Sequence, residues 1–184
     1  MLAAANLHPL SLKLAPVALI PLAAYPYMKR FSWTCHLVLG LALSIAPTGA
    51  YIAIQGTLPL GIVFLGLAVG VWIAAFDVIY GCQDVEFDKA HGLNSMPVRF
   101  GIQGAMNLAK WMHVLSIVSF AAVGILFKLS WIYYVGVVLA AIVLIYQHSI
   151  VSSTDFSKVT QAYFMRNGLV GILMFLFTFA SLIF

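Results

Sequence analysis

Long runs of apolar residues set the fold class of this chain. A helix of about 20 apolar residues crosses the hydrocarbon core of a bilayer. Five runs of this length occur, at 35–54, 58–79, 106–127, 130–150 and 164–184. A sixth, at 10–28, contains Pro16, Pro21 and Pro26, which neighbouring helices can accommodate within a membrane. Because 64% of the residues are hydrophobic and only 8% are charged, we predict an all-α, polytopic transmembrane bundle of about six helices.

The basic residues are divided unequally between the two sides of such a bundle. Six crossings put the loops near 29–34, 80–105 and 151–163 on one side. Six Lys or Arg residues lie on or beside these loops: Lys29, Arg30, Lys89, Arg99, Lys158 and Arg166. The other side has only Lys128, with Lys13 near the chain start. The positive-inside rule therefore predicts that the loop at 80–105 is cytoplasmic. The sequence has no basic stripe and no soluble domain, so we expect no binding to nucleic acid.

Most of the acidic residues lie in one short segment at the end of the second of these five runs. Four of the five are there: Asp77, Asp84, Glu86 and Asp88. The fifth is Asp155. A carboxylate at bilayer depth costs roughly 2.5 to 3.5 kcal/mol on insertion scales. A cluster at a membrane boundary therefore needs water or a cationic partner, and function should be sought there.

The spacing of these acids predicts a common face if the helix continues through them. A rotation of about 100° per residue aligns Asp77, Tyr80, Asp84 and Asp88, whereas Glu86 points the opposite way. Three carboxylates in a column suit a hard divalent cation that also binds phosphate oxygens. We therefore predict a Mg²⁺ site for a diphosphate. The alternative is a solvated helix end whose acids pair with nearby Lys and Arg residues.

Small residues precede the acids on the same helix. Gly66, Gly70 and Ala74 recur every four residues on the face of Asp77, a pattern typical of close helix packing. We therefore expect Asp77 to face protein and not lipid. After the acids, the segment HGLNSMP (91–97) predicts a loop from its Gly, Asn, Ser and Pro content.

The segment YPYMKR holds a second polar group. Tyr25 and Lys29 are four residues apart at a helix end, and Arg30 follows. The group is either an interfacial aromatic residue with a basic anchor or a clamp for a diphosphate. The histidines form no pair at ligand spacing, so we expect them to hydrogen-bond at helix interfaces, and only His91 lies near the acids.

Two long segments resemble one enzyme family. DVIYGCQDVEFDKAHGLNSMPVRFG, residues 77–101, resembles the second aspartate-rich motif of the UbiA superfamily of intramembrane aromatic prenyltransferases. YPYMKRFSWTCHLVLGLALSIAPTGAYIA, residues 25–53, resembles the YxxxK element of that family and the helix after it. The two segments occur in the family's order, and the resemblance covers essentially the whole chain.

The resemblance implies roles for the polar residues. Asp84 and Asp88 would ligate Mg²⁺ on a polyprenyl diphosphate, and Asp77 would assist the metal or orient the acceptor. Tyr25 and Lys29 would hold the diphosphate and, with Asp77, take part in catalysis. Further substrate contacts would come from Arg30, Arg99 and Tyr80.

The implied reaction is transfer of a polyprenyl group from an allylic diphosphate to a small aromatic acid in the bilayer of a bacterial inner membrane. The motif spacing resembles the branch that acts on 4-hydroxybenzoate in quinone biosynthesis. A dihydroxynaphthoate acceptor, in menaquinone biosynthesis, stays open. So does a function without prenyl transfer, as a membrane transporter or an inactive paralogue.

One family feature is missing from the sequence. The first aspartate motif, of the NDxxD type, does not occur, and no acid precedes Asp77. The resemblance thus implies that 1–184 is a single transmembrane domain that matches the last six helices of a nine-helix fold. We expect the remaining carboxylates to hold at most one Mg²⁺ firmly, and the chain alone to have little or no transferase activity.

Overall fold

The computed structural model describes residues 7–151 and 159–184, with side chains over 7–151 and 165–184. In this part of the chain, helices are the only regular elements. They are α2 (Pro9–Met28), α3 (Cys35–Gln55), α4 (Leu60–Gly81), the 3₁₀ turn η1 (Cys82–Asp84), α5 (Val85–Ala90), α6 (Met96–Leu126), α7 (Trp131–Ile150) and α8 (Val159–Ile183). Within the described residues, six helical spans are long and apolar enough to cross a membrane, as predicted.

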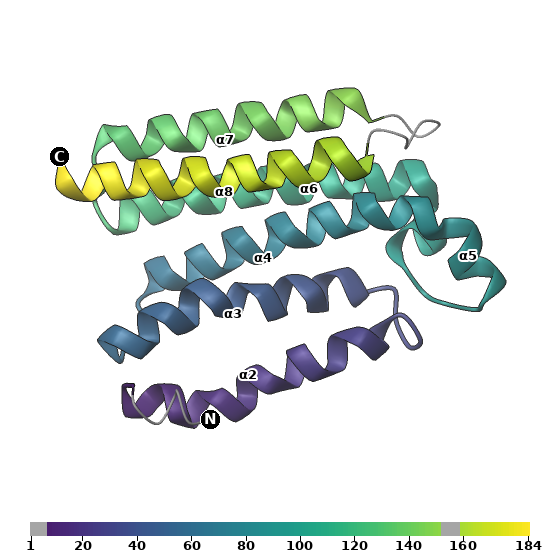
Figure 1. Cartoon of the computed structure of the whole chain (residues 1–184), viewed down its shortest axis with the longest axis horizontal. Helices are drawn as coiled ribbons and strands as arrows, with labels where there is room; N and C mark the ends of the chain where they lie inside the picture. Colours follow the sequence, from purple (N-terminus) through teal and green to yellow (C-terminus); the bar gives the residue numbers. More distant parts are fainter. Residues whose placement is uncertain (1–6, 152–158) are drawn as a thin grey trace.

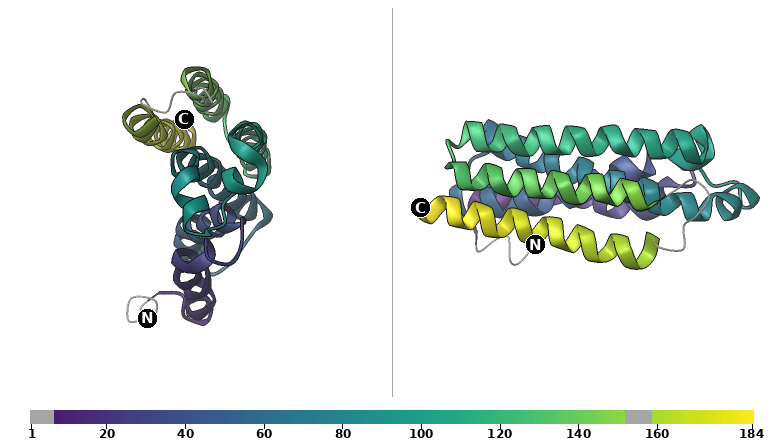
Figure 2. Two further views of the ribbon diagram at one scale, coloured as in Figure 1. Left: turned by 90° about the vertical axis from the view of Figure 1, so that its right-hand side faces the viewer. Right: turned by 90° about the horizontal axis from the view of Figure 1, so that it is seen from above.

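The long helices lie side by side and alternate in direction (Figure 1). The α2–α3 connection and α5 lie at one end of the bundle, and the α3–α4 and α6–α7 connections lie at the other. Seen end on, the helices form an elongated array with α2 at one edge and α7 and α8 at the other (Figure 2). The proline-containing helix α2 packs on α3, and none of its residues is buried.

Glycines allow α3 and α4 to approach each other closely. A Cβ atom added to Gly40 of α3 would collide with the backbone carbonyl oxygen of Gly70 on α4. A Cβ atom on Gly66 would lie 2.6 Å from Cγ2 of Thr48. The prediction of close packing along Gly66, Gly70 and Ala74 is therefore confirmed.

Gly40→Ala is expected to destabilise the protein by about 1 to 3 kcal/mol, the usual cost of overpacking. The collision is with backbone, so no side-chain rotation can relieve it. Gly168→Ala in α8 is the matched control, since a Cβ atom there meets nothing within 4 Å. Thermal unfolding in detergent micelles measures both, and equal midpoints would contradict the packing argument.

The start of α6 corrects the sequence prediction. The predicted span began at 106, but α6 begins at Met96 and is kinked at Gly101, which has φ 72°. Ser95 caps the helix by accepting a hydrogen bond from the N–H of Val98 at 3.4 Å. Pro97 lies in the first turn, where a missing N–H costs nothing. The proline therefore begins the helix, and the loop narrows to 91–95.

Candidate functional site

Three polar segments meet at the end of the bundle that carries α5 (Figure 1). They are the connection between α2 and α3, the acidic segment of η1 and α5, and the connection between α5 and α6. Asn94 joins two of them, because its backbone N–H donates to the carbonyl oxygen of Lys29 at 2.6 Å. Its side-chain amide also donates to the carbonyl oxygens of Lys29 and Arg30, at 3.4 Å each. The Cys35 thiol donates in turn to the carbonyl oxygen of Asn94 at 3.6 Å. These bonds fix the connection between α5 and α6 against that between α2 and α3.

Lys29 lies between two carboxylates of the acidic segment. Its Nζ donates to both carboxylate oxygens of Asp88, at 3.2 and 3.1 Å, and lies 3.8 Å from Oδ2 of Asp84. The Asp88 side chain is 1% exposed, whereas that of Asp84 is 47% exposed. Burial alone would lower the pKa of Lys29, but the hydrogen bond from Asp88 and the charges of Asp88 and Asp84 outweigh it and raise that pKa. Lys29 is therefore a cation held between two acids.

Asp77 has a different partner. The Nδ1–H of His36, on α3, donates to Oδ2 of Asp77 at 2.7 Å. The imidazole is 1% exposed, and its Nε2 has no hydrogen-bond partner among the described residues. Gly81 leaves room for this ring, because a Cβ atom there would lie 3.0 Å from Cε1 of His36. Asp77 thus faces protein, as predicted.

The predicted single column of carboxylates is wrong. Because α4 ends at Gly81 and the turn η1 intervenes, the helix does not continue with one register through the acids. Tyr80, which the predicted column also included, is 40% exposed. Among the described residues, no group of three or more His, Cys, Asp or Glu side chains lies close enough together to hold a metal ion.

The two remaining carboxylates nevertheless suit Mg²⁺ with a phosphorylated ligand. Mg²⁺ in proteins is commonly bound by one or two carboxylates, with substrate phosphates and water completing the octahedron. Asp84 and Asp88 both direct an oxygen at the same cation, the Lys29 ammonium. The pair Asp84 and Asp88 therefore fits a single metal ion, and metal ligation by Asp77 stays a prediction.

The other predicted residues lie on the same or neighbouring elements. Tyr25 is half-buried on α2, one turn before Lys29. Arg30 and Arg99 are exposed and form no ion pair with a described residue. Lys158 and Asp155 lie outside the described residues.

Sequence reasoning missed two residues of the site, His36 and Asn94. It named His91 as the histidine near the acids, but His91 stacks on Phe87 with the ring centroids 4.0 Å apart and is exposed. The sequence does hold a signal for His36, which lies at the predicted start of a helix shortly after the YPYMKR segment. An intramembrane acid such as Asp77 needs a partner, and a histidine at this position could supply it.

His36→Leu is expected to destabilise the protein by about 1.5 to 3 kcal/mol, because hydrogen bonds to charged groups contribute that much. His36→Gln, which retains a donor, should lose less. His91→Leu is the control, since His91 is exposed and does not contact Asp77. Chemical unfolding of the purified variants measures these differences. A loss no larger for His36→Leu than for His91→Leu would show that the contact with Asp77 contributes little.

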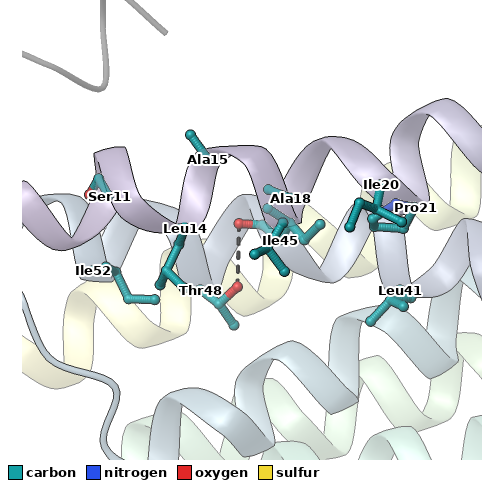
Figure 3. A pocket seen from close by; sticks show the side chains of 12 residues that line it. Ser11, Leu14, Ala15, Ala18, Ile20, Pro21, Leu41, Ile45, Thr48 and Ile52 are labelled. Atoms are coloured by element: carbon teal, nitrogen blue, oxygen red, sulfur yellow. Dashed lines mark hydrogen bonds between the residues drawn. The ribbon is translucent and has the colours of Figure 1, made fainter.

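Two apolar grooves lie along the helices that lead to the site, and neither is lined by one of its charged residues. One, of about 470 Å³, lies between α2 and α3 and extends from Pro21 and Leu41 to Ser11 and Ile52 (Figure 3). The other, of about 410 Å³, lies between α3 and α4 and includes Ala74. The volume and apolar lining of both grooves would suit a long hydrocarbon chain.

Comparisons with known proteins agree on one family. The family described as "UbiA prenyltransferase family" matches residues 1–179. A protein of Edwardsiella ictaluri named 4-hydroxybenzoate octaprenyltransferase is 32% identical over 176 residues, which cover 93% of this chain and 59% of the relative. A protein of Nitrosospira multiformis with the same name is 30% identical over 169 residues, covering 92% and 58%.

A solved structure is also similar. The apo structure of a UbiA homologue from Aeropyrum pernix K1 superposes with a TM-score of 0.84 at 30% identity, covering 97% of this chain and 66% of that one. The chain therefore spans less than two thirds of the length of the proteins that it matches.

Proposed function

Because this chain belongs to the UbiA prenyltransferase family, we propose that it takes part in the transfer of a polyprenyl group from an allylic diphosphate to an aromatic acid. We propose 4-hydroxybenzoate as the acceptor, since the two relatives at 30% and 32% identity are named for it. The observation that carries the proposal is the placement of Lys29 between Asp84 and Asp88, on a bundle that also has apolar grooves along α2, α3 and α4. A polyprenyl diphosphate needs charged groups for its diphosphate head and an apolar space for its hydrocarbon tail.

The diphosphate side of the reaction would be handled by the acidic segment and the end of α2. Asp84 and Asp88 would hold Mg²⁺, which supplies positive charge that favours departure of the diphosphate. Lys29 would release Asp88 and pair with a phosphate oxygen, while the Tyr25 hydroxyl would donate to another. The apolar grooves would keep water away while the allylic C–O bond breaks and diphosphate departs. An aromatic carbon would then attack the allylic carbon, and the ring would lose the proton of that aromatic carbon.

Asp77 would orient the aromatic acceptor. Its carboxylate is fixed by His36 and stands apart from the pair of acids around Lys29. We therefore propose that Asp77 orients the aromatic ring and that His36 positions Asp77. Tyr80, Arg30 and Arg99 remain candidates for substrate contacts at the rim.

The chain is a multi-pass integral membrane protein, with six spanning helices in the described residues. We propose that 1–184 acts as a single domain in a bacterial inner membrane and that the end with α5 is cytoplasmic, because basic residues lie on or beside the connections at that end. These are Lys29, Arg30, Lys89 and Arg99.

Prenyl transfer in membranes tests the proposal. Labelled polyprenyl diphosphate is supplied with 4-hydroxybenzoate or with dihydroxynaphthoate. The chain is assayed alone and after co-expression with a family segment that bears the first aspartate motif. Mg²⁺-dependent product that disappears with Asp84→Ala but persists with the control Glu86→Gln would support the proposal, and the productive acceptor would identify the substrate. Failure with both acceptors, although the two segments associate, would favour a transporter or an inactive paralogue.

A further inference from the structure

A second polar group lies on the far side of α4 from α2 and α3 (Figures 1 and 2). A hydrogen bond of 2.8 Å joins Nδ1 of His113, on α6, to Nε2 of His148, on α7. His113 is 3% exposed. Polar side chains within membrane helices are costly, so such a group suggests a function of its own. The proposed prenyl transfer uses neither histidine.

These histidines belong to the wall of a groove between α6 and α7. The groove has a volume of about 450 Å³, and its polar wall consists of Lys110, His113 and His148. The rest of its lining is apolar: Val114, Ile117, Val118, Ala141, Leu144 and Ile145. Val118 is 58% and Ile145 is 70% exposed, so the groove opens on the outer surface of the bundle, which faces lipid.

The groove is polar at one end and apolar along its length. His148 lies two residues before the end of α7, on the side of the bundle that carries α5. Val118 lies eight residues beyond Lys110 on α6, and Ala141 lies seven residues before His148 on α7. At 1.5 Å per residue the apolar lining extends about 10 to 12 Å away from the polar end. The polar end thus lies near headgroup depth and the apolar part lies among acyl chains.

Two unused binding groups remain at the polar end. Lys110 is exposed and forms no ion pair with any acid in the described part of the chain. Nδ1 of His148 is buried and has no hydrogen-bond partner among the described residues. A cation beside an unpaired imidazole nitrogen is complementary to a headgroup with a phosphate anion and a hydroxyl.

We propose that the groove between α6 and α7 binds an anionic phospholipid of the surrounding bilayer. The phosphate accepts from the Lys110 ammonium, and a hydroxyl of the headgroup bonds Nδ1 of His148. One acyl chain lies along the apolar lining toward Val118 and Ala141. A phosphatidylglycerol headgroup has both required groups.

Native mass spectrometry of the purified chain in detergent micelles tests this, with phosphatidylglycerol and phosphatidylcholine as probes. We expect the wild type to prefer phosphatidylglycerol. Lys110→Ala should weaken its binding about fivefold, because a basic residue near anionic lipid contributes about 1 kcal/mol. Ala141→Phe, which fills the groove and keeps the charge, should weaken binding as well.

Lys128→Ala, at the other end of the bundle, is the control and should leave lipid binding unchanged. Equal binding of both lipids, or equal losses in Lys110→Ala and Lys128→Ala, would overturn the proposal. An unchanged affinity in Ala141→Phe, or full displacement of the lipid by inorganic phosphate, would do the same, because either would place the ligand outside the groove. Asp88→Asn should bind the lipid normally, so this test is independent of prenyl transfer.

Discussion

Asp88→Asn is expected to weaken Mg²⁺-dependent binding of a polyprenyl diphosphate by about 100-fold. Asp88 is the most buried acid of the site, and both of its carboxylate oxygens accept hydrogen bonds from Lys29. Truncating one partner of a buried charge pair typically costs 2 to 5 kcal/mol, and each 1.4 kcal/mol is tenfold in affinity. An amide removes the charge that would hold the metal and retains the shape of the side chain.

Glu86→Gln provides the matched control for this prediction. Glu86 lies two residues before Asp88, but its side chain is 92% exposed and forms an ion pair with Lys89, at 3.6 Å. Calorimetric titration of the purified chain with a short-chain allylic diphosphate, with Mg²⁺ or with a chelator, measures both variants. If Asp88→Asn and Glu86→Gln bind alike, the acidic segment acts only through its overall charge and Asp88 is not a metal ligand.

The spanning helices could be predicted because bilayer thickness fixes how many apolar residues a helix needs. Even α2, with three internal prolines, forms where the hydropathy indicated. The glycine contacts between α3 and α4 could also be predicted, since a recurrence of small residues every four positions permits close approach whatever surrounds it.

The geometry of the site could not be predicted to the same depth. The alignment of Asp77 with Asp84 and Asp88 required an unbroken helix, and one 3₁₀ turn after Gly81 removes it. The partner of Asp77 is 41 residues away on another helix, and no local periodicity specifies such a contact. The predicted loop includes Pro97, whereas the structure places this proline in the first turn of α6, a position where proline is favoured.

Lys29→Met is expected to destabilise the protein by about 2 kcal/mol in the absence of divalent cations. It leaves the carboxylate of Asp88, 1% exposed, without a cation. Breaking a fully buried pair costs about 3 to 5 kcal/mol. The loss here should be smaller because the Lys29 side chain is 34% exposed and therefore partly screened by solvent.

The double variant Lys29→Met with Asp88→Asn separates stability from binding. Two neutral side chains of similar shape leave no uncompensated charge, so its unfolding midpoint should return close to that of the wild type, while diphosphate binding stays lost. Mg²⁺ should stabilise Lys29→Met more than the wild type, because the ion supplies the positive charge that Asp88 lacks, and it should not stabilise the double variant. A double variant no more stable than Lys29→Met would mean that Lys29 acts through packing alone. The charge balance around Asp88 would then no longer account for the position of Lys29 between the two acids.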